Sequence, residues 1–256
     1  MRTSAQVKAY FRQHGADLCG IASVDRFEDA PQGYHPLDVL PTARSVIVIA
    51  RRFPVATLQC RSSVPYTVAR NALSTELDVL ACRFCTDAEA EGIAAVPTGT
   101  IGPTERDPRD GRMHNILSAK HAAQAAGLGV IGRNTLLITP EYGNMVWLNA
   151  LVCDLPLESD ALSDARWCDG CALCVDACPA RALGNPAMAQ DTCCAYAFGG
   201  ENGGEWKIKC LRCREVCPHC YGEQNRPAQG TQLPHVSGAD RRGAGKQTLL
   251  ATGRSG

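Results

Sequence analysis

Residues 168–183 read CDGCALCVDACPARAL, and residues 210–218 read CLRCREVCP. The first run places four cysteines at the spacing C-x2-C-x2-C-x3-C-P, which bacterial ferredoxins use to bind 4Fe-4S clusters. Its first three thiolates bind one cluster, and its fourth binds the neighbouring cluster. The second run has the shortened spacing C-x2-C-x3-C-P and needs one further ligand. Together the runs predict a small bacterial-type ferredoxin domain with two 4Fe-4S clusters.

The missing ligand must lie upstream of the second run, where Cys193 and Cys194 are both available. The cross-ligation pattern predicts one cluster on Cys168, Cys171, Cys174 and Cys217, and the other on Cys178, Cys193 (or Cys194), Cys210 and Cys213. The alternative is a pair of four-cysteine zinc sites, which also use C-x2-C pairs. Zinc needs neither a third cysteine at such close spacing nor the C-P step, so the pattern favours clusters.

The composition excludes several classes of protein. The 256 residues include 15 cysteines, and 26 basic residues balance 26 acidic ones. Without a net positive charge the chain has no bulk attraction to nucleic acid or to an anionic membrane, so tRNA is a doubtful partner. No apolar run of about 18 residues predicts a membrane span. The start lacks the apolar core of a signal peptide, so we expect a cytoplasmic protein whose crowded cysteines bind metal.

The front of the chain alternates helix-like and strand-like segments. Residues 46–49 form a continuous β-branched run, as in a strand buried on both faces, and residues 67–92 have helical periodicity. Residues 134–139 and 145–152 resemble strands joined by the turn PEYGN. This pattern predicts an α/β (α+β) sheet domain with flanking helices.

Three parts follow from these patterns. We expect a sheet domain over residues 1–160, a ferredoxin-like domain over 161–221, and a polar, glycine-rich and disordered tail over 222–256. Cys82 and Cys85 form another C-x2-C pair, but no second pair lies nearby. We therefore expect them to be ordinary thiols.

Residues 127–143, GLGVIGRNTLLITPEYG, together with the cysteine pattern resemble the epoxyqueuosine reductases and their relatives among the reductive dehalogenases. The similarity extends over residues 5–221. It implies a nitroreductase-like α/β domain that binds cobalamin and is fused to the two-cluster domain. The implied activity is that of an oxidoreductase, in which low-valent cobalt acts on an epoxide or a carbon–halogen bond. It also implies an electron donor such as ferredoxin or flavodoxin, and a small-molecule or corrinoid partner.

The resemblance also suggests site residues. Members of the family have an aspartate, the supposed proton donor, upstream of the G-L-G loop. The corresponding position here is Met113, and the adjacent His114 could donate a proton or simply pack on the following helix. The family's spacing from a cysteine to an aromatic residue favours Cys193 over Cys194. Candidate contacts to a cofactor are Gly127, Gly129, Gly132, Arg133 and Asn134, flanked by Lys120 and His121.

The glycines have a simpler explanation, which is a helix stop followed by a tight turn.

Two other functions also fit the sequence. One is an electron-transfer or activator protein without turnover of its own, whose front domain docks a partner such as a corrinoid protein. The other is a purely structural metal protein.

Overall fold

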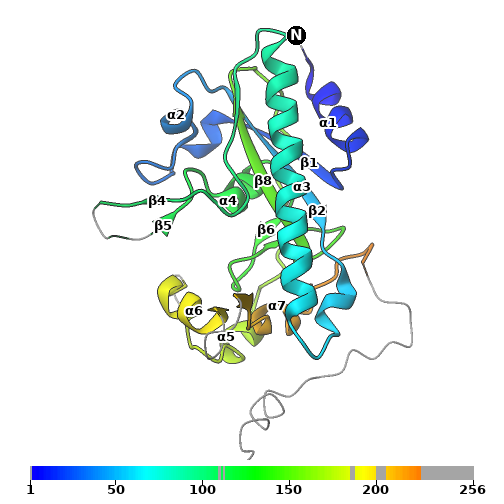
Figure 1. The fold of residues 1–256 in the computed structure, drawn as a ribbon, viewed down its shortest axis with the longest axis vertical. Helices are drawn as coiled ribbons and strands as arrows, with labels where there is room; N and C mark the ends of the chain where they lie inside the picture. The colour runs from blue at the N-terminus through cyan, green and yellow to red at the C-terminus, as the bar shows by residue number, and fades with distance from the viewer. Residues whose placement is uncertain (1, 109–110, 112, 185–187, 200–205, 226–256) are drawn as a thin grey trace, which may run out of the picture. The chain divides into compact units, whose positions relative to one another are not determined.

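The computed structural model describes residues 2–108, 111, 113–184, 188–199 and 206–225. The chain divides into two compact units, Met1–Arg226 and Pro227–Gly256, and all described residues belong to the first unit (Figure 1). Most of the predicted tail therefore lies outside the described residues. Its first part is described: the backbone amides of Glu223 and Gln224 donate to the carbonyls of Pro140 and Glu141.

A four-stranded antiparallel sheet forms the centre of the first unit. Its order is β1-β2-β8-β3, with β1 Leu18–Ser23, β2 Ser45–Arg52, β8 Val146–Cys153 and β3 Ala95–Pro97. The expected sheet domain with flanking helices is therefore present, and its sheet is antiparallel throughout. Residues 46–49 are fully buried within β2, as their β-branched run predicts.

Helices cover both faces of this sheet. On one face, α1 (Ser4–Gln13) and α3 (Val64–Glu89) pack against Ile47 and Ile49. On the other face, the alanines of α4 (Ala119–Ala125) pack against Val46 and Val48. Successive side chains of a strand point to opposite faces, so one short apolar run supplies both cores. Figure 1 shows α3 running the length of the sheet.

The aromatic side chains beneath α3 make the first core sensitive to truncation. Phe84 is 1% exposed, and its ring centroid lies 4.7 Å from that of Phe11. We expect Phe84→Ala to lower the free energy of unfolding by about 3–5 kcal/mol, because it removes buried apolar area and leaves a cavity. Anaerobic denaturant unfolding measures the loss. Val79→Ala, at an exposed position of the same helix, is the control and should change stability by less than about 0.5 kcal/mol.

The turn PEYGN is present, but its flanking strands belong to different sheets. Thr139 and Gly143 form a β-bridge across the turn. Before it, β7 (Leu137–Ile138) pairs with β6 (Val130–Ile131) in a separate ribbon. After it, β8 is paired on both sides, by β2 and β3. The strand before the turn therefore pairs with β6 and not with β8.

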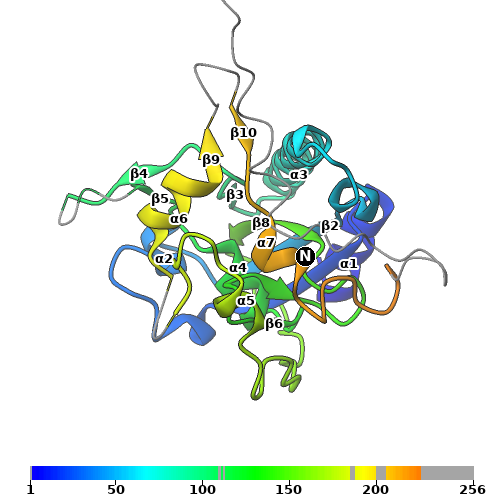
Figure 2. The same cartoon turned by 90° about the horizontal axis from the view of Figure 1, so that it is seen from below.

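The remaining elements are short. In Figure 1, α5, α6 and α7 lie below the sheet, and Figure 2 views them from that side. No helix in the described ranges is long and apolar enough to cross a membrane. The short elements are η1 Val24–Phe27, α2 Pro36–Val39, η2 Val55–Leu58, β4 Glu105–Arg106, β5 Met113–His114, α5 Leu173–Asp176, α6 Gln190–Ala197, β9 Phe198–Gly199, β10 Lys207–Ile208 and α7 Arg212–Glu215.

Candidate metal centre

The helices α5 and α7 have the same backbone construction. The residue before each helix, Ala172 or Leu211, has φ near −125° (−127° and −123°) and ψ near 0° (6° and 8°). The Ala172 carbonyl accepts a hydrogen bond from the amide of Asp176, and the Leu211 carbonyl accepts one from the amide of Glu215, both at 3.0 Å. The repeated cysteine spacing is therefore a repeated backbone structure, in which each short helix begins two residues after a cysteine.

Four thiols from both runs form a first set. Burial raises the pKa of the Cys174 thiol, and the neighbouring Cys168 and Cys171 raise it further. Burial also raises the pKa of Cys217, and Cys168 and Cys174 add to that increase. The fold thus brings Cys217 from the second run into electrostatic contact with the first three cysteines of the first run.

The second set joins the other cysteines. Burial raises the pKa of Cys193, with further increases from Cys194, Cys210 and Cys178. Burial raises the pKa of Cys213 to about 11, and Cys210 and Cys193 contribute to that rise. Cys194 itself is exposed, whereas Cys193 is half-buried among the other thiols. Cys174 also contributes to the pKa of Cys213, so the two sets are adjacent.

A loop of the sheet domain lies directly against both sets. The backbone N–H of Arg133 donates to the sulfur of Cys168 at 3.4 Å, and its guanidinium donates to the Cys171 carbonyl at 3.0 Å. The side-chain amide of Asn134 donates to the Cys213 carbonyl at 3.3 Å. A Cβ on Gly132 would lie 3.3 Å from the Cys168 sulfur. The sequence did not reveal these contacts, because they join segments far apart in the chain.

The other two loop glycines have close neighbours within the chain itself. Gly127 has φ +72°, which suits the end of α4, and a Cβ there would lie 2.0 Å from the Ala161 carbonyl oxygen. A Cβ on Gly129 would lie 2.0 Å from the Ile138 carbonyl oxygen. These approaches explain both glycines without a ligand. Contact of either with a cofactor stays a prediction.

His114 and Lys120 occupy different surroundings. His114 is half-buried in β5, its ring centroid is 4.6 Å from that of Tyr34, and its Nδ1 lies 3.0 Å from the Asn115 carbonyl oxygen. These contacts are consistent with packing, and its role as a proton donor stays a prediction. Lys120 donates to the Thr135 carbonyl at 2.7 Å. Burial lowers its pKa, while Cys213 and Cys193 oppose that change, so Lys120 faces the second set.

Two polar groups beside the first set fit a cluster. The Nε1 of Trp167, the residue before Cys168, is buried and has no hydrogen-bond partner among the described residues. The Asn144 side chain forms a hydrogen bond with the Cys217 thiol, which lowers the pKa of that thiol. Buried donors normally have acceptors. The sulfur atoms of a 4Fe-4S cluster would supply acceptors here, and hydrogen bonds to cluster sulfur are common in such sites.

The thiols of the two sets do not converge on single points. In the ranges that the structure describes, no three His, Cys, Asp or Glu side chains are close enough to hold one metal ion. Thiolates on one zinc ion each lie about 2.3 Å from it. The thiolates of a 4Fe-4S cluster bind separate iron atoms and are spaced more widely. All fifteen cysteines are free of disulfides.

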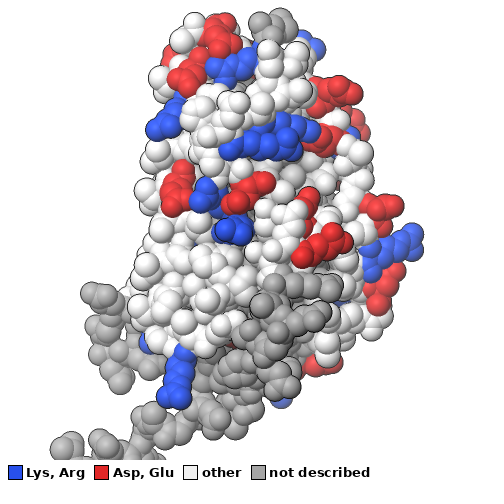
Figure 3. Space-filling view, turned by 90° about the vertical axis from the view of Figure 1, so that its right-hand side faces the viewer, with Lys and Arg blue, Asp and Glu red and all other residues white. Residues whose placement is uncertain are grey.

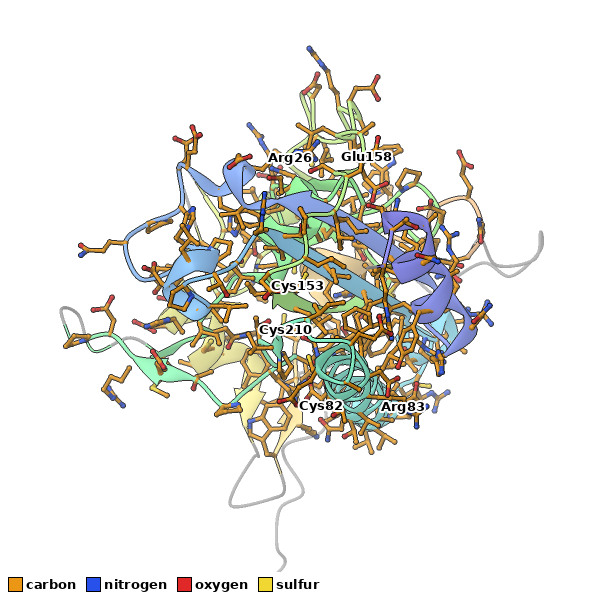
Figure 4. All side chains as sticks on the ribbon, turned by 90° about the horizontal axis from the view of Figure 1, so that it is seen from above. Arg26, Cys82, Arg83, Cys153, Glu158 and Cys210 are labelled. Atoms are coloured by element: carbon orange, nitrogen blue, oxygen red, sulfur yellow. The ribbon has the colours of Figure 1, made fainter. Side chains whose placement is uncertain are left out.

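The cysteines outside the runs occupy ordinary positions. Cys82 is exposed on α3 and Cys153 is buried in β8, as labelled in Figure 4. Burial raises the pKa of Cys85 to about 12 and that of Cys153 to about 11. At neutral pH both are therefore protonated thiols.

Two cavities lie away from this centre. One of about 480 Å³ is lined by residues of α1 and by residues 158–161, and one of about 390 Å³ lies along α3. No residue from Gly127 to Asn134 lines either cavity, although Ala161, which lines the first, packs against Gly127.

No protein-family model matches the chain. An epoxyqueuosine reductase of Gloeobacter violaceus is 30% identical over 258 residues, which cover 84% of this chain and 76% of that protein. The chain belongs to the epoxyqueuosine reductase family. The family's enzyme from Staphylococcus aureus is 27% identical over 81% of this chain, and the match spans 62% of the enzyme.

Solved structures confirm the resemblance in fold. A selenomethionine-labelled epoxyqueuosine reductase superimposes with a TM-score of 0.62 at 23% identity, covering 88% of this chain and 68% of the enzyme. A B12-dependent reductive dehalogenase gives 0.65 at 19% identity, with 87% and 32% covered. Another epoxyqueuosine reductase was solved with an epoxyqueuosine-modified tRNA stem loop. It superimposes with a TM-score of 0.55 at 22% identity, covering 86% of this chain and 66% of that enzyme. The tRNA stem loop is a ligand of that relative, and the expectation that tRNA is a doubtful partner of this chain stays a prediction.

Proposed function

We propose that this chain is an iron–sulfur oxidoreductase of the epoxyqueuosine reductase type, with two 4Fe-4S clusters in a ferredoxin-like domain. Cys168, Cys171, Cys174 and Cys217 hold the first cluster, and Cys178, Cys193, Cys210 and Cys213 hold the second. The observation that carries this proposal is the interlocking of the two runs: Cys217 lies with the first set, and Cys178 lies with the second. Cross-ligation of this kind is typical of two-cluster ferredoxins.

The loop after α4 connects the clusters to the sheet domain. Arg133 and Asn134 fix the cysteine runs against this loop through three hydrogen bonds. We propose that electrons from a donor such as ferredoxin or flavodoxin pass through the clusters toward a site on the sheet domain. The proton donor we propose for that site is His114, through its imidazole N–H.

We propose cobalamin as the cofactor of that site on the family likeness alone. When bound, cobalamin supplies a low-valent cobalt that can reduce the substrate. Addition of cob(II)alamin to the anaerobic protein should give the absorption and EPR changes of a bound, base-off form. Intact clusters without any such change would instead assign the chain as an electron-transfer or activator protein.

The substrate we propose is a small molecule with an epoxide or a carbon–halogen bond. The chain has equal numbers of basic and acidic residues, and Figure 3 shows both charge signs intermixed on one face. Nucleic-acid binding depends on clustered basic residues that neutralise phosphates. Tight, salt-sensitive binding of an epoxyqueuosine-modified tRNA stem loop would contradict this choice and assign tRNA. We also place the protein in the cytoplasm, where reducing conditions keep cysteines available for metal.

Metal analysis tests the cluster assignment. Protein purified without oxygen should be brown and contain about eight iron atoms and as much acid-labile sulfide per chain. A chain that contains about two zinc ions and little iron would instead hold four-cysteine zinc sites.

A further inference from the structure

Arg214 is a buried cation without an ionic partner in the described part of the chain. It lies in α7 and is only 5% exposed. Its Nη1 donates to Asn144 Oδ1 at a long 3.4 Å and lies 3.7 Å from the Met145 sulfur. Its guanidinium carbon lies 6.0 Å from the Tyr66 ring centroid. All of these partners are neutral, and no carboxylate among the described residues forms an ion pair with Arg214.

A buried guanidinium is strongly unfavourable unless a nearby negative charge compensates it. The nearby Cys220 is no counter-ion, because it is 1% exposed and packs in an apolar cluster with Tyr66 and Met145. Cys213 directly precedes Arg214 in the sequence and belongs to the second thiol set. A 4Fe-4S cluster with four thiolates carries a net negative charge, which would compensate Arg214.

We infer that Arg214 is a fixed positive charge that raises the reduction potential of the cluster held by Cys178, Cys193, Cys210 and Cys213. This inference rests on the proposed function, because it requires that the second set holds a cluster. Reduction adds one electron to the cluster and makes its charge more negative by one. A fixed cation nearby therefore stabilises the reduced state more than the oxidised state, and net charge is one of the factors that set such potentials.

Redox titration of the full chain tests this role. The anaerobic protein is titrated with dithionite and mediators, its reduced clusters are followed by EPR, and iron per chain is measured in every sample. We expect Arg214→Gln to keep the iron. The equilibrium constant for one-electron reduction of one cluster should fall about tenfold, which lowers its reduction potential by about 59 mV. The other cluster should shift less. Arg214→Lys keeps the charge and should keep most of the potential.

Arg212→Gln is the matched control. It removes a positive charge from the same helix, but this side chain is 35% exposed and its guanidinium lies 3.9 Å from Glu215. Its effect on the potential should be smaller and should fade in 1 M salt, because solvent-exposed charges are screened. The shift caused by Arg214→Gln should persist, because buried charges are screened much less.

The possible outcomes separate the inference from the proposed function. Full iron content and unchanged potentials in Arg214→Gln would overturn the inference while leaving the clusters in place. Loss of iron in both Arg214→Gln and Arg214→Lys would also overturn it, because packing rather than charge would then be the requirement. If Arg214→Gln lost iron while Arg214→Lys kept both the iron and the reduction potential, the positive charge would be the requirement, and the inference would be supported. Wild-type protein with zinc in place of iron would instead defeat the proposed function.

Discussion

Cys193→Ala should lose about half of the iron, leaving about four atoms per chain on the first cluster. The physical reason is position: Cys193 lies among the thiols of Cys178 and Cys210, which both affect its pKa. A cluster that loses one of four thiolates is exposed to water and to oxidation. Anaerobic iron and sulfide analysis, together with the EPR signal of the reduced protein, measures the loss.

Cys194→Ala is the matched control, since it removes the adjacent thiol of the same helix. Cys194 is exposed. Partial burial raises the pKa of its thiol, and the second cause of that rise is the carboxylate of Asp191, not another cysteine of the set. We expect this variant to keep about eight iron atoms per chain. If Cys194→Ala lost half of the iron and Cys193→Ala kept all of it, Cys194 would be the ligand.

Gly143→Ala should strongly destabilise the contact between the PEYGN turn and the end of the second cysteine run. Gly143 has φ +59°, and a Cβ there would lie 2.3 Å from the His219 carbonyl oxygen. The left-handed backbone alone costs about 1–3 kcal/mol for a residue with a side chain. Displacing the backbone of residues 219–220 adds a cost of similar size. We expect a large drop in the thermal midpoint and weaker retention of the cluster that Cys217 binds.

Gly92→Ala separates the cost of the left-handed backbone from the cost of the collision. Gly92 has φ +75°, but a Cβ there would meet no atom within 4 Å. It therefore has the backbone strain without the collision. Both variants are compared by anaerobic thermal unfolding and by iron per chain. Equal losses of stability and iron in the two variants would show that the turn does not support the cluster region.

Local patterns in the sequence predicted the features that depend on local structure. The β-branched run of β2 predicted a strand buried on both faces, because burial and propensity act within a few residues. The sequence showed the repeated cysteine spacing, and the structure gives it a repeated form, because α5 and α7 have matching hydrogen bonds. The turn at residues 140–144 followed from its proline and glycine.

Contacts between distant segments could not be predicted in this way. β7 pairs with β6, whereas β8 pairs with β2 and β3 in another sheet, and no local pattern shows this division. The sequence could not show that the side chains of Arg133 and Asn134 donate to the backbone of the cysteine runs, and their contact with a cofactor stays a prediction. The burial of Arg214 depends on Asn144 and Met145 of another segment. Spacing predicted which cysteines bind metal, whereas only the fold showed the surroundings of those cysteines.

The most direct test of the two interlocked clusters is the EPR spectrum of the fully reduced, anaerobic protein. Two adjacent clusters should give about two spins per chain and a broad spectrum with magnetic interaction between them. The same measurement on Cys193→Ala should give a single, uncoupled signal. A reduced wild-type protein without an iron–sulfur signal, or with two signals that show no interaction, would contradict the account.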